Sequence, residues 1–283
     1  MFSVRVWGDR GSMPTPGPDT VLFGGNTACL EVRCDDRLVV IDSGSGIRKL
    51  GDKVMREDLP KGPLSIDMLV THTHWDHILG FPMFTPIFVP GTKLRIRGPI
   101  SYEDDSLEKV FGSLLSYRYW PVRQEELGAK IEYQQIKETT LDLGDGIFVT
   151  TKYLNHPILC LGYRIEYKGK SFVTAYDNEP FYNLFPTDPS DPSYDAEAAR
   201  EGEAAARDEN EKLLRFCQGA DLLIHDAQYT AKEYQASKRG WGHSSYEYAI
   251  NVAHKTRAKR LILFHHDPNR TDAELQELEL FYQ

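Results

Sequence analysis

Cysteine is sparse in this chain of 283 residues, and its few thiols show no pairing pattern. The four cysteines are Cys29, Cys34, Cys160 and Cys217, and none of them forms a C-x-x-C spacing. Scattered thiols of this kind are typical of small buried side chains in a reducing cytoplasm, and they argue against a disulfide framework. Only Cys29 and Cys34 are close enough in sequence to meet across a turn.

Long hydrophobic runs are also missing. The most apolar stretch, Ile78 to Val89, is too short for a membrane span and is broken by Pro82 and Pro86. The segment Met1 to Arg5 enters an alternating strand pattern directly and lacks the features of a signal peptide. We therefore expect a cytoplasmic protein without a membrane partner.

Positive charge is in deficit, and the formal net charge is −9. A polyanionic partner requires a basic surface, so the composition disfavours nucleic-acid binding without excluding it. One basic run, Lys255 to Arg260, ends a predicted helix, where cations complement the helix dipole. We favour that role over an RNA contact. The sequence leaves a homodimer open.

Histidine is scarce as well, with 9 residues, yet three of them occur within six positions. His72 and His74 are two residues apart on an extended turn, so their side chains point the same way and can bind one ion. Asp76 and His77 follow in the expected first turn of a helix and point elsewhere, which leaves room for a second ion. The apolar segment Leu64 to Val70 predicts a buried strand directly before the cluster. The pattern therefore favours a metal site over surface or core histidines.

Three further residues extend the cluster into a motif order that resembles the metallo-β-lactamase-fold hydrolases. His156 follows a predicted strand, and Asp177 and His265 each close another one. In that family these positions are the isolated His, the bridging Asp and the final His. The resemblance assigns His72, His74 and His156 to one metal, and Asp76, His77 and His265 to the other, with Asp177 bridging both.

Two more motifs resemble the ribonuclease Z-like branch of that superfamily. His225-Asp226-Ala227 is similar to the branch's His-Glu-Ala box, and Gly242-His243-Ser244 is similar to its downstream His-Ser motif. The box carries Asp226 where the family has Glu, so the backbone must bring this shorter carboxylate closer to its partner. Tyr119-Trp120-Pro121 is similar to a segment of cyclic phosphodiesterase-like members. These two aromatic residues could stack on a nucleobase, although core packing is the default.

The resemblance implies a dinuclear metal-dependent phosphodiesterase that hydrolyses a small or cyclic, cyclic-nucleotide-like phosphodiester by attack of a metal-bridging hydroxide. The two divalent ions are expected to be zinc, with manganese or iron as alternatives. Asp76 would also accept the proton of the attacking water. His243, oriented by Asp226, would stabilise the phosphoryl group or protonate the leaving oxygen. His225 is a further catalytic candidate, weighed equally against a buried structural histidine.

Three other functions stay open. The first is a tRNA-processing ribonuclease, against which we count the absence of a long glycine-rich arm that would hold a tRNA. The second is a thioester or lactam hydrolase, which the two phosphodiesterase-like boxes oppose. The third is a non-enzymatic metal or nucleotide sensor, which we would expect to have lost ligands.

The fold that the resemblance implies is an α/β metallo-β-lactamase-type αββα sandwich, with two facing mixed sheets and helices outside. We expect one domain over residues 1–283, with an inserted loop and helix at about 183–217. The predicted strands are Phe2–Trp7, Ala28–Cys34, Leu38–Ile41, Ile66–Thr71, Lys93–Arg97, Ile131–Tyr133, Ile147–Tyr153, Gly162–Tyr167, Ser171–Ala175, Leu222–Ile224 and Leu261–Phe264. The predicted helices are Ile47–Arg56, Tyr102–Leu115, Ala196–Cys217, Tyr246–Lys255 and Asp272–Phe281.

Overall fold

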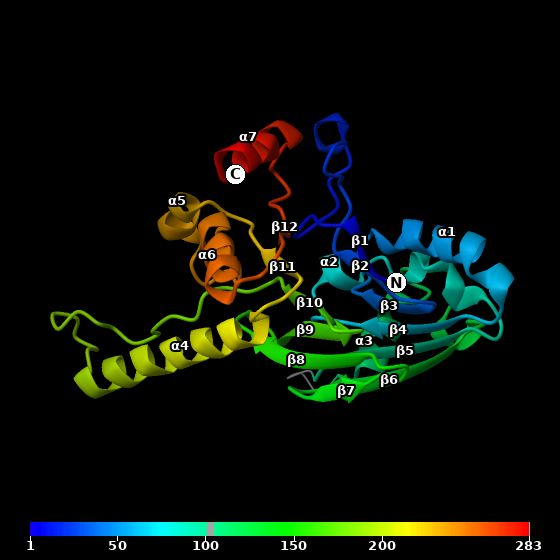
Figure 1. Ribbon diagram of the computed structural model, residues 1–283, viewed down its shortest axis with the longest axis horizontal. Helices are drawn as coiled ribbons and strands as arrows, with labels where there is room; N and C mark the ends of the chain where they lie inside the picture. The colour runs from blue at the N-terminus through cyan, green and yellow to red at the C-terminus, as the bar shows by residue number, and fades with distance from the viewer. Residues whose placement is uncertain (101–104, 283) are drawn as a thin grey trace.

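Two six-stranded sheets form the centre of the structure, a computed structural model that describes residues 1–100 and 105–282 (Figure 1). The first sheet has the order β1 (Phe2–Gly8), β2 (Cys29–Cys34), β3 (Arg37–Ile41), β4 (Ser65–Leu69), β5 (Lys93–Pro99) and β6 (Lys130–Ile136). The second has the order β12 (Leu261–Phe264), β11 (Leu222–Asp226), β10 (Lys170–Ala175), β9 (Cys160–Tyr167), β8 (Phe148–Leu154) and β7 (Thr140–Asp142). Both sheets are mixed, as predicted, because β3 to β6 and β10 to β12 run parallel while the other pairs are antiparallel.

The sandwich is held together by side chains that alternate along each strand. In β3, Val39 and Ile41 enter the core between the two sheets, whereas Leu38 and Val40 face the helices outside the first sheet. A period of two is what a strand buried on both faces requires, since successive side chains point to opposite faces. All four cysteines are buried and free, as expected from their scatter.

Helices cover the outer face of each sheet. α1 (Ile47–Glu57) and α3 (Leu107–Leu114) pack on the first sheet, and α4 (Ala196–Cys217) and α6 (Tyr246–Thr256) pack on the second. The remaining α-helices among the described residues are α2 (Trp75–Ile78), α5 (Ala231–Glu233) and α7 (Asp272–Tyr282). None of the helices in this part of the chain has the length and apolar character needed to cross a membrane.

α3 begins later than predicted. Ser106 is its N-cap, and the side chain of this serine accepts a hydrogen bond from the backbone N–H of Lys109. The predicted start at Tyr102 lies outside the described residues, and the helix itself starts at Leu107. The strand β7 was not predicted, because three residues are too few for a recognisable alternation.

The loop of residues 181–195 and the first half of α4 project from the body of the sandwich as an arm (Figure 1). The loop folds back on the helix, since the side-chain amide of Asn183 donates to the carbonyl oxygen of Ala199 at 2.7 Å. At the base of the arm, Nζ of Lys152 in β8 lies 3.2 Å from Oε2 of Glu209. Many of the arm's helical residues are alanine and glutamate, which favour helix without needing a core contact.

Candidate metal centre

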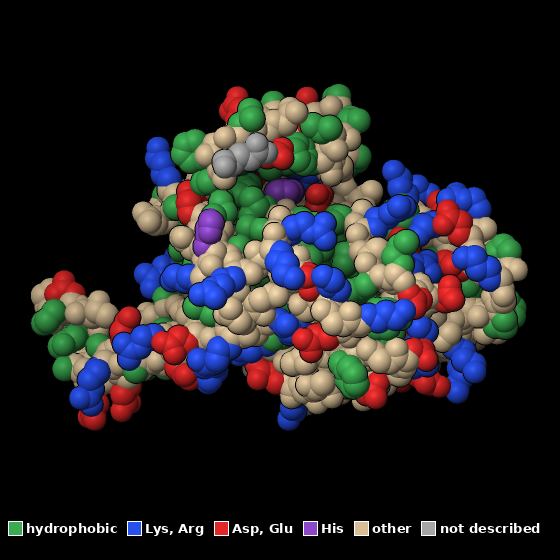
Figure 2. All heavy atoms as spheres, viewed as in Figure 1, with side chains coloured by type: hydrophobic (Ala, Val, Ile, Leu, Met, Phe, Trp, Pro, Cys, Tyr) green, Lys and Arg blue, Asp and Glu red, His purple; other side chains and the backbone are tan. Residues whose placement is uncertain are grey.

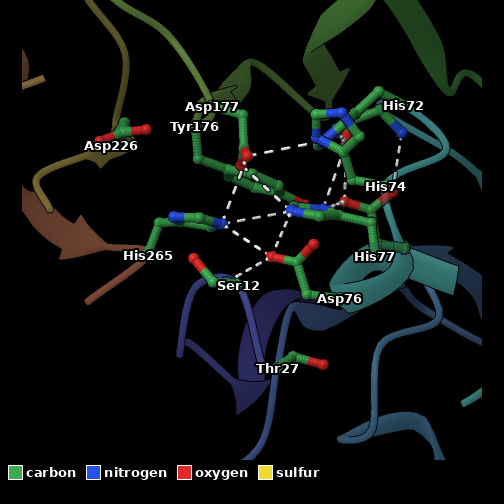
Figure 3. Close-up of polar contacts among 12 residues, drawn as sticks. Ser12, Thr27, His72, His74, Asp76, His77, Tyr176, Asp177, Asp226 and His265 are labelled. Atoms are coloured by element: carbon green, nitrogen blue, oxygen red, sulfur yellow. Dashed lines mark hydrogen bonds and ion pairs between the residues drawn. The ribbon is translucent and has the colours of Figure 1, made fainter. Parts of the chain in front are cut away.

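The seven candidate ligands come together where parallel strands of the two sheets end. β4 ends just before the cluster that contains His72, and β10 and β12 end just before Asp177 and His265. Figure 3 shows Asp76, His77, Asp177 and His265 pointing toward one another from different segments of the chain. The carboxyl ends of neighbouring parallel strands are a common place for ligand sites.

Short distances link the side chains into two groups. In the first group, Nδ1 of His74 lies 3.1 Å from Nε2 of His156, and both can join His72 at one ion. In the second group, Nε2 of His265 lies 3.1 Å from Oδ2 of Asp76, and both can join His77. Within each group the ligand atoms lie within 4.8 Å of one another.

Asp177 lies between the two groups. Its Oδ2 atom is 3.6 Å from Nε2 of His72 and 3.3 Å from Nε2 of His265, and its Oδ1 atom is 3.2 Å from Nε2 of His77. Asp177 is therefore within reach of members of both groups.

The chemistry of the donors fits divalent cations. Nε2 of His72 is buried and has no hydrogen-bond partner among the described residues. A buried polar atom without a partner is costly, and a bound cation would satisfy this atom. Imidazole and carboxylate ligands in this number suit zinc and also manganese or iron.

The backbone at several of these positions has a positive φ, which turns the chain sharply where a strand ends. The φ angle is 59° at Asp42, 58° at Asp177 and 63° at His265. Ser12, with a φ of 64°, uses its backbone N–H to donate a 2.7 Å hydrogen bond to Oδ2 of Asp76. These turns direct the side chains toward a common centre.

A supporting residue, Asp42, holds His77 in place. Oδ2 of Asp42 lies 2.8 Å from Nδ1 of His77 and accepts a hydrogen bond of 2.8 Å from the hydroxyl of Thr71. A carboxylate on the second ring nitrogen fixes the tautomer of a ligating histidine and leaves Nε2 for the metal. The turn after β3 contains Asp42, but nothing in the local spacing indicated that it reaches His77.

Burial and charge shift the pKa values of the histidines in different directions. Burial lowers the pKa of His72 and brings that of His156 to about 4, so both rings are neutral at pH 7 and able to ligate. Burial also acts to lower the pKa of His77 and His265, but Asp177 and Asp76 outweigh it and bring the pKa of His265 to about 9. This half of the centre attracts positive charge, which a cation would supply in place of the protons.

Asp226 and His243 form a pair beside the centre. Nδ1 of His243 lies 2.7 Å from Oδ2 of Asp226, so the shorter side chain makes the contact expected of the family's Glu. The imidazole of His243 stacks on that of His265, with ring centroids 4.7 Å apart. His243 is thus close to both the second group of ligands and Asp177.

His225 lies elsewhere. Successive residues of β11 point to opposite faces, and the His225 ring packs near Tyr248 of α6 while Asp226 faces the centre. Nδ1 of His225 is 2.8 Å from the carbonyl oxygen of Asp226, which can accept a hydrogen bond from the ring N–H. The described residues show no contact between its ring and the seven candidate ligands, and a catalytic role for His225 stays a prediction.

Glu179 is a buried residue that the motifs did not indicate. Its Oε1 atom accepts hydrogen bonds from the hydroxyl of Tyr234 at 2.6 Å and from the backbone N–H of Gly240 at 2.7 Å. Its Oε2 atom accepts from the N–H of Gly242 at 3.0 Å, and the carbonyl of Gly242 lies 3.0 Å from Nδ1 of His156. Glu179 therefore fixes the segment that leads to His243.

Several proteins named ribonuclease Z are similar to this chain in sequence. That of Lactococcus lactis subsp. lactis is 30% identical over 233 residues, which cover 70% of this chain and 69% of that protein. That of Thermoplasma acidophilum is 27% identical over 305 residues, which cover 96% of this chain and 89% of that protein. No family model matches the chain.

Solved structures share the fold over almost the whole chain. A metallo-β-lactamase fold protein of Bacillus subtilis, YhfI, and a diphosphatase of the PhnP family each have a TM-score of 0.62 and 19% identity. Each of these alignments covers 98% of this chain and 91% of the other. Human tRNase Z, short form, has a TM-score of 0.60 and 21% identity, with 94% and 93% covered.

Proposed function

We propose a phosphodiesterase activity for this chain, which belongs to the ribonuclease Z-like branch of the metallo-β-lactamase-fold hydrolases. Its substrate would be a small or cyclic phosphodiester. The observation that carries the proposal is the His243–Asp226 pair, held at 2.7 Å directly beside two groups of metal-ligating side chains. Cleavage of a phosphodiester is accelerated by two metal ions, which activate water, and by a general acid, which protonates the leaving oxygen.

The proposed ligands of the first ion are His72, His74 and His156. Those of the second are Asp76, His77 and His265, and Asp177 is shared. When bound, two divalent ions would lower the pKa of water and stabilise charge on a phosphoryl oxygen.

The protein's own residues supply the proton transfers. Asp76 has a pKa that burial acts to raise but that His77 and His265 hold well below its usual range, so it stays ionised and can accept a hydrogen bond from the attacking water. The Asp226 carboxylate accepts a hydrogen bond from Nδ1 of His243. Nε2 of the same ring is therefore the atom that can donate to the oxygen of the leaving group. The Nε2–H would donate its proton as the P–O bond breaks.

Charge favours a small substrate over RNA. On the face shown in Figure 2, Lys and Arg side chains are interleaved with Asp and Glu and do not form one basic field. The arm adds no basic surface, because acidic residues outnumber basic ones in residues 181–206. An acidic arm repels a polyanion, whereas a small phosphodiester needs only the centre itself.

A tRNA-processing ribonuclease is the second candidate, and the names of the sequence relatives favour it. Zinc- or manganese-reconstituted protein should be assayed on bis(p-nitrophenyl) phosphate, on a panel of cyclic nucleotides and on a precursor tRNA. Turnover of the small diesters with a poor rate on the tRNA is the expected result. Efficient tRNA cleavage without turnover of any small diester would replace the first proposal by the second.

A further inference from the structure

Two of the four tryptophans are exposed, and both lie within two residues in sequence of a side chain of the candidate metal centre or of its neighbour His243. Trp7 and Trp120 are partly buried and pack against the core between the first sheet and its outer helices. Trp120 is therefore not free to stack on a nucleobase, the alternative that the sequence had left open. Trp75 and Trp241 instead leave 75% and 56% of their surface exposed. An indole in water is unfavourable, and exposed aromatic side chains at a site are typical of ligand contacts.

The two exposed indoles come from segments that meet at the centre. Trp75 is the first residue of α2 and stands between the candidate ligands His74 and Asp76. Trp241 directly precedes Gly242, whose carbonyl lies 3.0 Å from Nδ1 of His156. His156 in turn lies 3.1 Å from His74, so the two segments that carry the indoles meet at the centre.

A cation accompanies Trp241. Nζ of Lys238 lies 4.0 Å from the centroid of the Trp241 ring and 5.3 Å from that of Tyr229. Within the described residues Lys238 forms no ion pair with a carboxylate, so its charge is available to an anion. Glu179 fixes this segment through Tyr234, Gly240 and Gly242. The backbone on either side of Lys238 and Trp241 is therefore fixed before a ligand binds.

We infer that Trp75 and Trp241 form a stacking subsite for a planar ring of the substrate, with Lys238 contacting a phosphate. The ligand class is a nucleotide, and the inference rests on the proposed phosphodiesterase function. Stacking alone tolerates every base, so the subsite selects for the presence of a nucleobase and not for its identity.

The test compares two phosphate ligands that differ in the base. Isothermal titration of zinc-reconstituted protein should show that adenosine 5′-monophosphate binds at least about tenfold more tightly than ribose 5-phosphate, an effect of one stacked base. Trp75→Ala and Trp241→Ala should each remove most of this preference, and Trp241→Phe should retain it because the ring is kept. Lys238→Ala should weaken both ligands equally. Phe281→Ala is the matched control, since Phe281 is an aromatic residue of α7 that is 78% exposed.

Equal affinity of the wild-type protein for the two ligands, or no detectable binding of the nucleotide, would overturn the inference. A Trp75→Ala/Trp241→Ala double variant that keeps the preference would overturn it as well. Turnover is measured separately, so the two proposals fail separately. Hydrolysis of bis(p-nitrophenyl) phosphate without a preference for the base refutes only the subsite, and preferential binding of the nucleotide without hydrolysis of any phosphodiester refutes only the proposed function.

Discussion

Both oxygens of the Asp226 carboxylate are hydrogen-bonded, and one of them bonds to His243. Oδ2 lies 2.7 Å from Nδ1 of His243, and Oδ1 accepts a hydrogen bond of 3.0 Å from the backbone N–H of Ser244. The orientation of the His243 ring therefore depends on a residue at the end of β11. This dependence can be tested without touching any candidate metal ligand.

Asp226→Asn should lower kcat for bis(p-nitrophenyl) phosphate by about 10- to 100-fold, because an amide cannot hold the charged form of His243. KM and metal content should change little. The control is Asp221→Asn, a change just before the other end of the same strand, where the carboxylate pairs with Lys259. A kcat of Asp226→Asn within twofold of the wild-type value would contradict the proposed role.

Asp177→Ala should abolish turnover and lose at least one bound metal, because Asp177 lies between the two groups of candidate ligands. The measurement is metal analysis of the purified variant alongside its activity. Asp177→Asn keeps the size of the side chain and tolerates the positive φ of 58°, so it separates loss of charge from a folding defect. Full metal content in both variants would refute a bridging Asp177.

Removal of metal by a chelator should stop activity and lower the melting temperature. Without cations, the buried carboxylates of Asp76 and Asp177 keep only their contacts with protein groups, chiefly the histidines. Zinc, manganese and iron(II) should then be added back one at a time. The ion that the centre binds should restore both the activity and the melting temperature. Unchanged activity after complete demetallation, shown by metal analysis, would exclude a metal-dependent mechanism.

Acid should destabilise the protein through Asp67, which is buried in β4. Burial acts to raise the pKa of Asp67, but hydrogen bonds from Arg95, Arg97 and Arg37 bring it below its usual value. The folded pKa is thus lower than the unfolded value of about 4, so this stabilisation is complete above pH 4 and is lost as the pH falls toward the folded pKa.

Asp67→Asn should therefore reduce the free energy of unfolding by about 2 kcal/mol at pH 7, and by progressively less as the pH falls below 4. Urea denaturation at a series of pH values measures both effects. Asp145→Asn removes the exposed partner of the same Arg37 and should have an effect of under about 0.5 kcal/mol. A pH dependence of stability that is identical in Asp67→Asn and the wild type would show that Asp67 does not contribute.

The sequence was most informative where function depends on local spacing. The cluster from His72 to His77 lies within six positions, and His156, Asp177 and His265 each follow a strand whose apolar pattern is recognisable. The structure brings all seven together because β4, β8, β10 and β12 all end at the edge where the ligands lie.

The supporting contacts could not be found in this way. Asp42 reaches His77 across 35 positions, and Glu179 reaches Gly240 and Gly242 across 61 and 63 positions. Only the packed fold makes these residues neighbours. The exposure of Trp75 could not be predicted for a similar reason, since its residue type does not show whether the indole beside His74 packs inward or faces solvent.

The left-handed backbone at Ser12, Asp42, Asp177 and His265 implies a trade-off between stability and activity. Each such non-glycine residue stores about 1 kcal/mol of strain, which is tolerated where a site gains from it. His265→Gly and His265→Ala should both abolish activity, because both lose the imidazole. Calorimetry of the two metal-free variants should find the glycine variant at least as stable as the alanine variant, since glycine adopts a φ of 63° without strain. A glycine variant that melts well below the alanine variant would contradict this. Selection for catalysis is then what keeps histidine at a position whose backbone conformation suits glycine better.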